Sequence, residues 1–91
     1  MYFVTANCRV AYQSDNLQDC LDQAKQLYGF VGGLVSVWKG CKDNPIDIAF
    51  SNRLFFIYKC EEKFTELGFS ELKKIKESET EVINNGIDRN T

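Results

Sequence analysis

The sequence predicts an α+β fold with the element order β-α-β-β-β, in which an antiparallel sheet carries one amphipathic helix on one face. Two periodicities and one composition predict it. Apolar residues alternate over residues 2–12, they recur at spacings of three and four over residues 17–28, and short β-favouring runs follow. With 91 residues, 44% of them apolar, the chain is large enough for one core. We expect a single domain over residues 1–78 and a weakly structured or disordered tail over residues 79–91.

The first expected element is a strand over residues 2–12, because its even positions are apolar while Thr5, Asn7 and Arg9 stand between them. Residues 13–16 then supply turn and N-cap chemistry, which predicts a helix that starts near Asn16 or Leu17. The apolar stripe of this helix is Leu17, Cys20, Leu21, Ala24, Leu27 and Tyr28. Gly29 is expected to end it.

Three further strands are expected after the helix. Residues 34–39 form a Val-rich run, and residues 46–51 alternate between apolar and small or polar side chains. Residues 54–60 are apolar on both faces, which is typical of a strand covered on both sides. Residues 40–45 include the only proline of the chain and predict a loop.

The composition becomes charged and helix-favouring after Cys60, which predicts one or two short helices with a break at Gly68. The segment around Val82 and Ile83 is an additional candidate strand. The formal net charge of the chain is −2, with more acidic than basic residues only after Cys60. This balance disfavours a domain whose affinity comes from neutralising nucleic-acid phosphates.

The chain starts without a basic and apolar leader, and it has no apolar run long enough to span a bilayer. We therefore expect a cytoplasmic protein that does not contact a membrane. In that reducing compartment the four cysteines are expected to be free thiols. Cys8, Cys20 and Cys60 follow the apolar pattern of their elements, so we expect them in the core rather than at a metal or redox site.

Catalysis is disfavoured by the absence of histidine, which is the usual general base and the commonest transition-metal ligand. The cysteines lack the close pairing of a structural zinc site. The glycine-rich segment at residues 29–33 follows a helix instead of preceding one, so it does not match a phosphate loop. We expect no enzyme activity, no cofactor and no metal.

The candidate binding site is the sheet face turned away from the helix. We expect it to hold Phe3, Trp38, Arg53, Phe55 and Ile57. Three covers for this face are open: the C-terminal helical segment, a second copy of the chain, or a target protein. Base stacking is disfavoured, because RNA-binding sheets carry glycine and basic residues between their aromatic rings and the run 53–58 has no such glycine.

The segment 21–27, followed by a glycine link, a Val-rich strand and the run 52–59, resembles the helix-and-meander layout of small phage-encoded inhibitors, among them type I-F anti-CRISPR proteins. The resemblance covers the layout of residues 2–62. It implies a protein without catalytic power that binds a nucleoprotein defence complex and blocks access to it.

Our leading hypothesis is therefore a non-enzymatic inhibitor, encoded by a phage or mobile element, that occludes a surface of a host or CRISPR-type defence complex. The alternative is a small dimerising or ligand-sensing regulatory module of ferredoxin-like topology, which requires a final strand near Val82 and Ile83.

Overall fold

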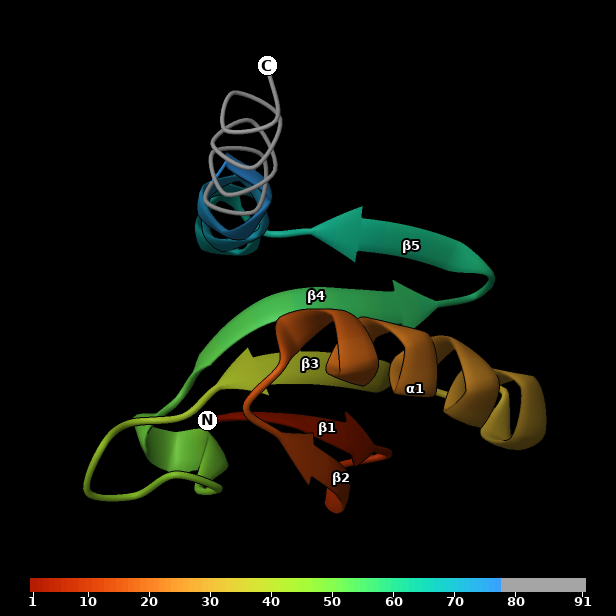
Figure 1. Ribbon diagram of the computed structural model, residues 1–91. Helices are drawn as coiled ribbons and strands as arrows, with labels where there is room; N and C mark the ends of the chain where they lie inside the picture. The colour runs from red at the N-terminus through yellow and green to blue at the C-terminus, as the bar shows by residue number, and fades with distance from the viewer. Residues whose placement is uncertain (78–91) are drawn as a thin grey trace, which may run out of the picture.

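The structure is a computed structural model that describes residues 1–77. It contains a five-stranded antiparallel sheet of order β2-β1-β3-β4-β5, and helix α1 lies across one face of this sheet (Figure 1). The elements are β1 (Tyr2–Ala6), β2 (Arg9–Ser14), α1 (Leu17–Val31), β3 (Val35–Lys39), the short 3-10 helix η1 (Ile48–Phe50), β4 (Asn52–Tyr58), β5 (Glu61–Phe64) and a helix over residues 66–77. The predicted α+β class and the helix on one face are confirmed. The expected tail at 79–91 and the candidate strand near Val82 lie outside the described residues.

The expected strand over residues 2–12 is in fact a hairpin, β1 and β2. Asn7 and Cys8 form the turn, with φ angles of 52° and 71° that match the left-handed requirement of a tight hairpin loop. The alternation concealed the turn because an irregularity in β2 brings Tyr12 back opposite Val4. The usual Asn-Gly signal is absent, since a cysteine occupies the glycine position.

Helix α1 begins where the sequence predicts. The side-chain oxygen of Asn16 accepts hydrogen bonds from the amides of Gln18 and Asp19 at 2.9 and 3.3 Å. The expected end at Gly29 is wrong, because the helix continues to Val31. Gly32 is the C-cap: its φ is 62°, and its amide donates to the carbonyl of Tyr28.

The strand expected at residues 46–51 is absent, and the short helix η1 takes its place. The side chain of Asp47 accepts a hydrogen bond from the amide of Ala49 at 2.9 Å, and the hydroxyl of Ser51 donates to the Asp47 carbonyl at 2.6 Å. These local bonds satisfy the backbone without a neighbouring strand. The alternation of side chains over residues 46–51 gives no indication that these local hydrogen bonds replace the hydrogen bonds of a strand.

The region after β4 also differs from the prediction. Lys59 and Cys60 form a second tight hairpin turn, with φ angles of 51° and 64°, and β5 follows before any helix begins. Thr65 caps the 66–77 helix, since its hydroxyl accepts a hydrogen bond from the amide of Gly68 at 3.0 Å. Gly68 therefore lies inside the first turn of this helix and does not break it.

The core lies between the sheet and α1. Leu72 and Ile75 of the 66–77 helix pack against this same core, so of the three covers left open for the opposite face, this helix is not the one. Cys20 is buried as predicted, whereas Cys8 and Cys60 are exposed because they occupy the two hairpin turns. The buried side chains of this core are Val4, Leu17, Cys20, Leu21, Ala24, Val35, Val37, Leu54, Phe55 and Ile57.

Within residues 1–77, no helix has the length and apolar character needed to cross a membrane.

Candidate functional site

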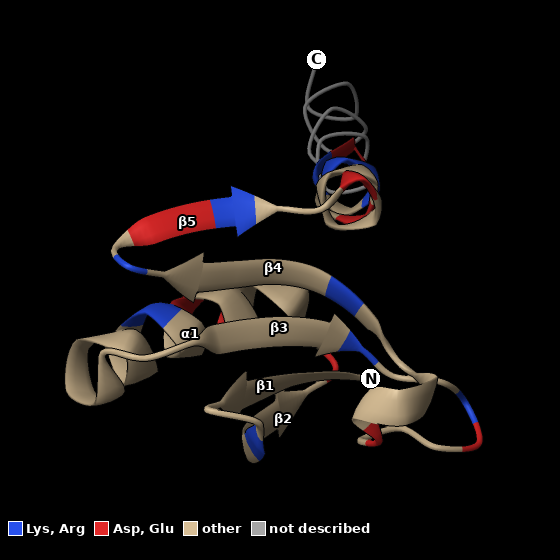
Figure 2. Ribbon diagram, turned by 180° about the vertical axis from the view of Figure 1, so that it is seen from behind, with Lys and Arg blue, Asp and Glu red and all other residues tan. Residues whose placement is uncertain are grey.

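The candidate site is the face of the sheet opposite α1, which we call the second face. Cross-strand pairing defines it: Phe3 lies opposite Trp38, Trp38 lies opposite Arg53, and Ser36 lies opposite Phe56. Antiparallel partners point to the same side of a sheet, so these residues share one surface. Figure 2 views the molecule from this side and shows β3 and β4 in front of α1, with no helix across them.

Three of the five predicted site residues, Phe3, Trp38 and Arg53, lie on the second face. Phe55 and Ile57 do not, because they point toward α1 and are 0% and 3% exposed. The predicted placement of these two residues on the second face is wrong.

The cause is an irregularity in β4. Val37 pairs with Phe55, whereas the next residue, Trp38, pairs with Arg53, so Leu54 is an extra residue in the strand. Such a β-bulge shifts the side-chain alternation by one position. Leu54 and Phe55 are both buried in the core, and Phe56 takes the place on the second face that strict alternation gives to Phe55. Sequence alternation alone contains no signal for this shift.

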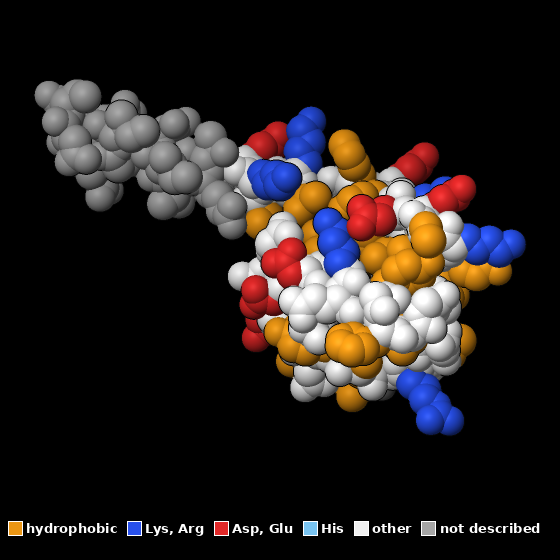
Figure 3. All heavy atoms as spheres, turned by 90° about the vertical axis from the view of Figure 1, so that its right-hand side faces the viewer, with side chains coloured by type: hydrophobic (Ala, Val, Ile, Leu, Met, Phe, Trp, Pro, Cys, Tyr) orange, Lys and Arg blue, Asp and Glu red, His pale blue; other side chains and the backbone are white. Residues whose placement is uncertain are grey.

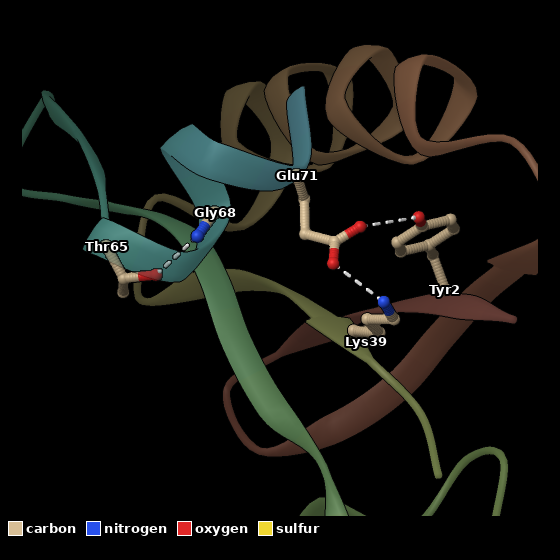
Figure 4. A network of polar contacts seen from close by, with 5 residues as sticks. All are labelled: Tyr2, Lys39, Thr65, Gly68 and Glu71. Atoms are coloured by element: carbon tan, nitrogen blue, oxygen red, sulfur yellow. Dashed lines mark hydrogen bonds and ion pairs between the residues drawn. The ribbon is translucent and has the colours of Figure 1, made fainter. Parts of the chain in front are cut away.

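The bulge is held by the start of the 66–77 helix. The amide of Thr65 donates to the carbonyl of Leu54 at 2.9 Å, and the Thr65 hydroxyl donates to the carbonyl of Arg53, also at 2.9 Å. The backbone of Gly68 also lies against the Leu54 carbonyl group, because a Cβ atom added at Gly68 would lie 1.8 Å from that carbonyl oxygen. Figure 4 shows Thr65 and Gly68 together at this point. The helix start therefore sets the direction of Arg53.

The aromatic centre of the second face is formed by Phe3 and Trp38, which are paired across β1 and β3. Phe3 is completely buried, and its ring stacks with that of Trp38 at a centroid distance of 6.2 Å and an interplanar angle of 8°. The indole nitrogen of Trp38 donates a hydrogen bond of 2.9 Å to the hydroxyl of the buried Thr5. Trp38 itself stays half-buried, so one oriented indole contributes to the surface.

Arg53 lies over the rings beside it. Its guanidinium carbon is 4.4 Å from the ring centroid of Phe56 and 5.9 Å from that of Trp38, which are cation-π distances. Arg53 is exposed, and within residues 1–77 it forms no ion pair with an acidic side chain.

Acidic side chains are absent from β1, β2, β3 and β4, as their sequences show. The edge strand β5 carries Glu61, opposite Tyr58, and this carboxylate is 3.2 Å from the amine of Lys63. The second face therefore combines aromatic rings with two cations, Arg53 and the Glu61-paired Lys63, which lies opposite Phe56. Such a surface is suited to binding.

On the opposite side, Glu71 joins the 66–77 helix to the sheet (Figure 4). Its carboxylate accepts a hydrogen bond of 2.7 Å from the amine of Lys39 and a longer one of 3.4 Å from the hydroxyl of Tyr2. The bond from Lys39 lowers the pKa of Glu71, and the same bond raises the pKa of Lys39. Burial, followed by the charge of Glu71, raises the pKa of Tyr2.

Two other surface features were weaker candidates. A hollow of about 860 Å³ lies beside the start of α1, but the side chains that line it include exposed polar ones such as Asp15 and Gln18. At the end of α1, Phe30 is 90% exposed. Figure 3 looks at this end of the molecule and shows its apolar side chains interspersed with charged ones. Neither feature combines oriented aromatic rings with a cation as the second face does.

No protein-family model, curated protein or solved structure matches this chain.

Proposed function

We propose that this chain is a non-enzymatic protein-binding module that acts by docking its second face on a partner and so blocking a surface of that partner. One observation carries the proposal: Trp38 and Phe56 remain partly exposed on a sheet face that α1 and the 66–77 helix leave open. Tryptophan, other aromatic residues and arginine are enriched at the energetic centres of protein interfaces. The second face has all three.

The narrower form of the proposal concerns the partner. The resemblance in layout to small phage-encoded inhibitors favours a host or CRISPR-type defence complex, with the chain encoded by a phage or mobile element. In that setting the chain would inhibit by occupying a surface, since nothing in the proposed action requires a chemical step. The dimerising alternative was tied to a ferredoxin-like order, β-α-β-β-α-β, and the hairpin before α1 departs from that order.

The docking face is tested by site-specific photo-crosslinking in the native host. A benzoylphenylalanine at position 56 places the reactive group on the second face, and one at Gln26, an exposed residue of α1, serves as the control. We expect a discrete adduct with another protein from position 56 and none of that mass from position 26. An adduct with a second copy of the chain, or equal adducts from both positions, would contradict the proposal.

The blocking action is tested separately, in cells that carry a type I-F CRISPR system directed against a phage. Expression of the chain is expected to restore plaque formation, and Phe56→Gln is expected to lose that effect while Phe56→Leu keeps it. Both variants are compared with the original chain by thermal melting, so that loss of folding is recognised. If expression of the original chain leaves the plaque count unchanged, the CRISPR-type target is wrong. The docking face is then judged by the crosslinking experiment alone.

A further inference from the structure

We infer that the second face recognises a carboxylate, and that the partner therefore presents an acidic side chain next to apolar ones. Arg53 is the anchor for that carboxylate. This inference rests on the proposed function, since it names the chemistry of the partner that the second face docks on.

The first argument is the preorganisation of Arg53. The bulge at Leu54 directs the side chain onto the second face, and the rings of Phe56 and Trp38 support its guanidinium at 4.4 and 5.9 Å. A guanidinium that lies on rings keeps its N–H groups free at its edge, where a carboxylate can accept two parallel hydrogen bonds. Because the side chain is already placed, less conformational entropy is lost on binding.

The second argument is charge complementarity. The chain as a whole has a net charge of −2, yet β1 to β4 contain no acidic residue. Each acidic side chain in the ion pairs of residues 1–77 is matched with a lysine or the N-terminal amine, and Arg53 is in none of these pairs. A carboxylate that docks on this face therefore meets Arg53 and no acidic side chain of β1 to β4, which favours this orientation of docking.

The same geometry disfavours nucleic acid as the ligand. A base stacks on an open ring face, but Phe3 is fully buried, and Arg53 already lies over Phe56 and Trp38. Stacking would displace Arg53 from both rings. The second cation that strand pairing places on this face, Lys63, is engaged by Glu61, which leaves little charge to follow a phosphate backbone.

The test uses a phage-displayed library of random dodecapeptides, selected against the full chain and against Arg53→Gln and Arg53→Glu. We expect peptides recovered on the original chain to be enriched in Asp and Glu over the input library by about threefold or more. Arg53→Gln should abolish this enrichment, and Arg53→Glu should reverse it in favour of Lys and Arg. Recovery of the same acidic content on the original chain and on Arg53→Gln would overturn the inference, as would a failure to enrich acidic residues at all.

Arg9→Glu is the matched control. Arg9 is exposed and lies opposite Ala6, which packs on the α1 side of the sheet, so this variant has the same net charge as Arg53→Glu without altering the second face. It should recover the same acidic peptides as the original chain. If Arg9→Glu shifts the selection as far as Arg53→Glu does, the effect is one of net charge, and the inference is wrong.

Two further arms separate the possible failures. The first arm uses a fluorescein-labelled oligouridylate. If it binds the original chain and not Arg53→Gln, the ligand of this face is nucleic acid and the carboxylate inference is overturned. Neutral apolar peptides that bind the original chain and Arg53→Gln alike, but not Phe56→Gln, would leave the proposed docking face standing while the carboxylate inference fails. Peptides that are indifferent to both substitutions would remove the docking face as well.

Discussion

At the scale of single residues, the surface of the second face depends on one buried hydroxyl group. Thr5 is 3% exposed and accepts the hydrogen bond from the indole of Trp38. The alternating pattern of residues 2–12 places Thr5 on the face opposite the apolar even positions, but it does not reveal that Thr5 is buried or that it has a partner. The partner follows from the pairing of β1 with β3, which brings residues 33 positions apart in the chain within 2.9 Å.

Thr5→Val should therefore release the indole of Trp38. We expect the free energy of unfolding to fall by about 1 kcal/mol, because the half-buried indole N–H loses its acceptor. Trp38 is the only tryptophan, so its indole N–H gives one resolved signal by NMR, and its hydrogen exchange should accelerate about fivefold. Thr5→Ser keeps the hydroxyl and should keep the protection. Equal exchange in the two variants would mean that the hydroxyl does not hold the ring.

Cys8 shows how a single residue can mislead a periodic pattern. It stands at an even position and was expected in the core, yet it is exposed in the β1–β2 turn with a φ of 71°. This left-handed conformation costs about 1 kcal/mol for a residue with a Cβ atom. Cys8→Gly should therefore raise the free energy of unfolding by about 0.5–1 kcal/mol in urea titrations. Cys8→Ala removes the thiol but keeps the Cβ atom, so a gain of the same size in that variant would contradict the explanation.

At the scale of elements, β4 explains both what the sequence predicted and what it missed. Its apolar run identified a strand correctly, since strand propensity and burial are local properties. The bulge at Leu54 is set instead by Thr65 and Gly68, which contact β4 from the start of the next helix. That contact depends on tertiary structure, so strict alternation placed Phe55 and Ile57 on the wrong face. Trp38 and Phe3 were placed correctly because no bulge separates them in the β1–β3 pairing.

Gly68 should consequently be intolerant of a side chain, although it lies within a helix. Gly68→Ala is expected to lower the free energy of unfolding by about 1–3 kcal/mol, because the new methyl group meets the carbonyl of Leu54. Gly29→Ala is the matched control, since a Cβ atom at that position within α1 meets nothing within 4 Å. It should raise the free energy of unfolding by up to about 1 kcal/mol through helix propensity. Chemical denaturation of both variants measures the two effects. Effects of the same sign would show that the structure around Gly68 adjusts to the methyl group, which would contradict the prediction.

At the scale of the whole molecule, the core is one-sided. Both α1 and the 66–77 helix pack on the same face of the sheet, and the opposite face carries the stacked rings of Phe3 and Trp38. The sequence predicted a strand at residues 54–60 that is covered on both sides, but on the second face Phe56 is only partly buried and Tyr58 is exposed. Which side the second helix takes was not predictable from its apolar residues alone, because Leu72 and Ile75 would suit either face. The polar contact of Glu71 with Lys39 and Tyr2 accompanies the observed choice.

This contact makes the stability of the molecule depend on pH in a defined way. The pKa of Glu71 is lowered from its ordinary value of 4.5, chiefly by the hydrogen bond from Lys39, so its contribution to stability is present above that value and is lost as the pH falls through the folded-state pKa. The pKa of Lys39 is raised above 10.5 by the same bond, so its contribution is lost only as the pH rises past that region. The contact should therefore contribute fully between these limits.

Glu71→Gln is expected to lower the free energy of unfolding by about 1 kcal/mol at neutral pH, a modest value because the Lys39 side chain is 43% exposed and partly screened by solvent. The difference from the original chain should shrink as the pH falls below 4.5, as the native carboxyl group takes up its proton. Glu62→Gln removes the acid of an exposed pair, Lys25 with Glu62 at 4.0 Å, and should change stability little at any pH. Urea titrations of the three chains across this range measure both effects. If the loss of stability in Glu71→Gln does not depend on pH, the side chain stabilises the helix by packing and not by its charge. If Glu71→Gln and Glu62→Gln lose equal stability, the effect is one of net charge and not of the contact with Lys39.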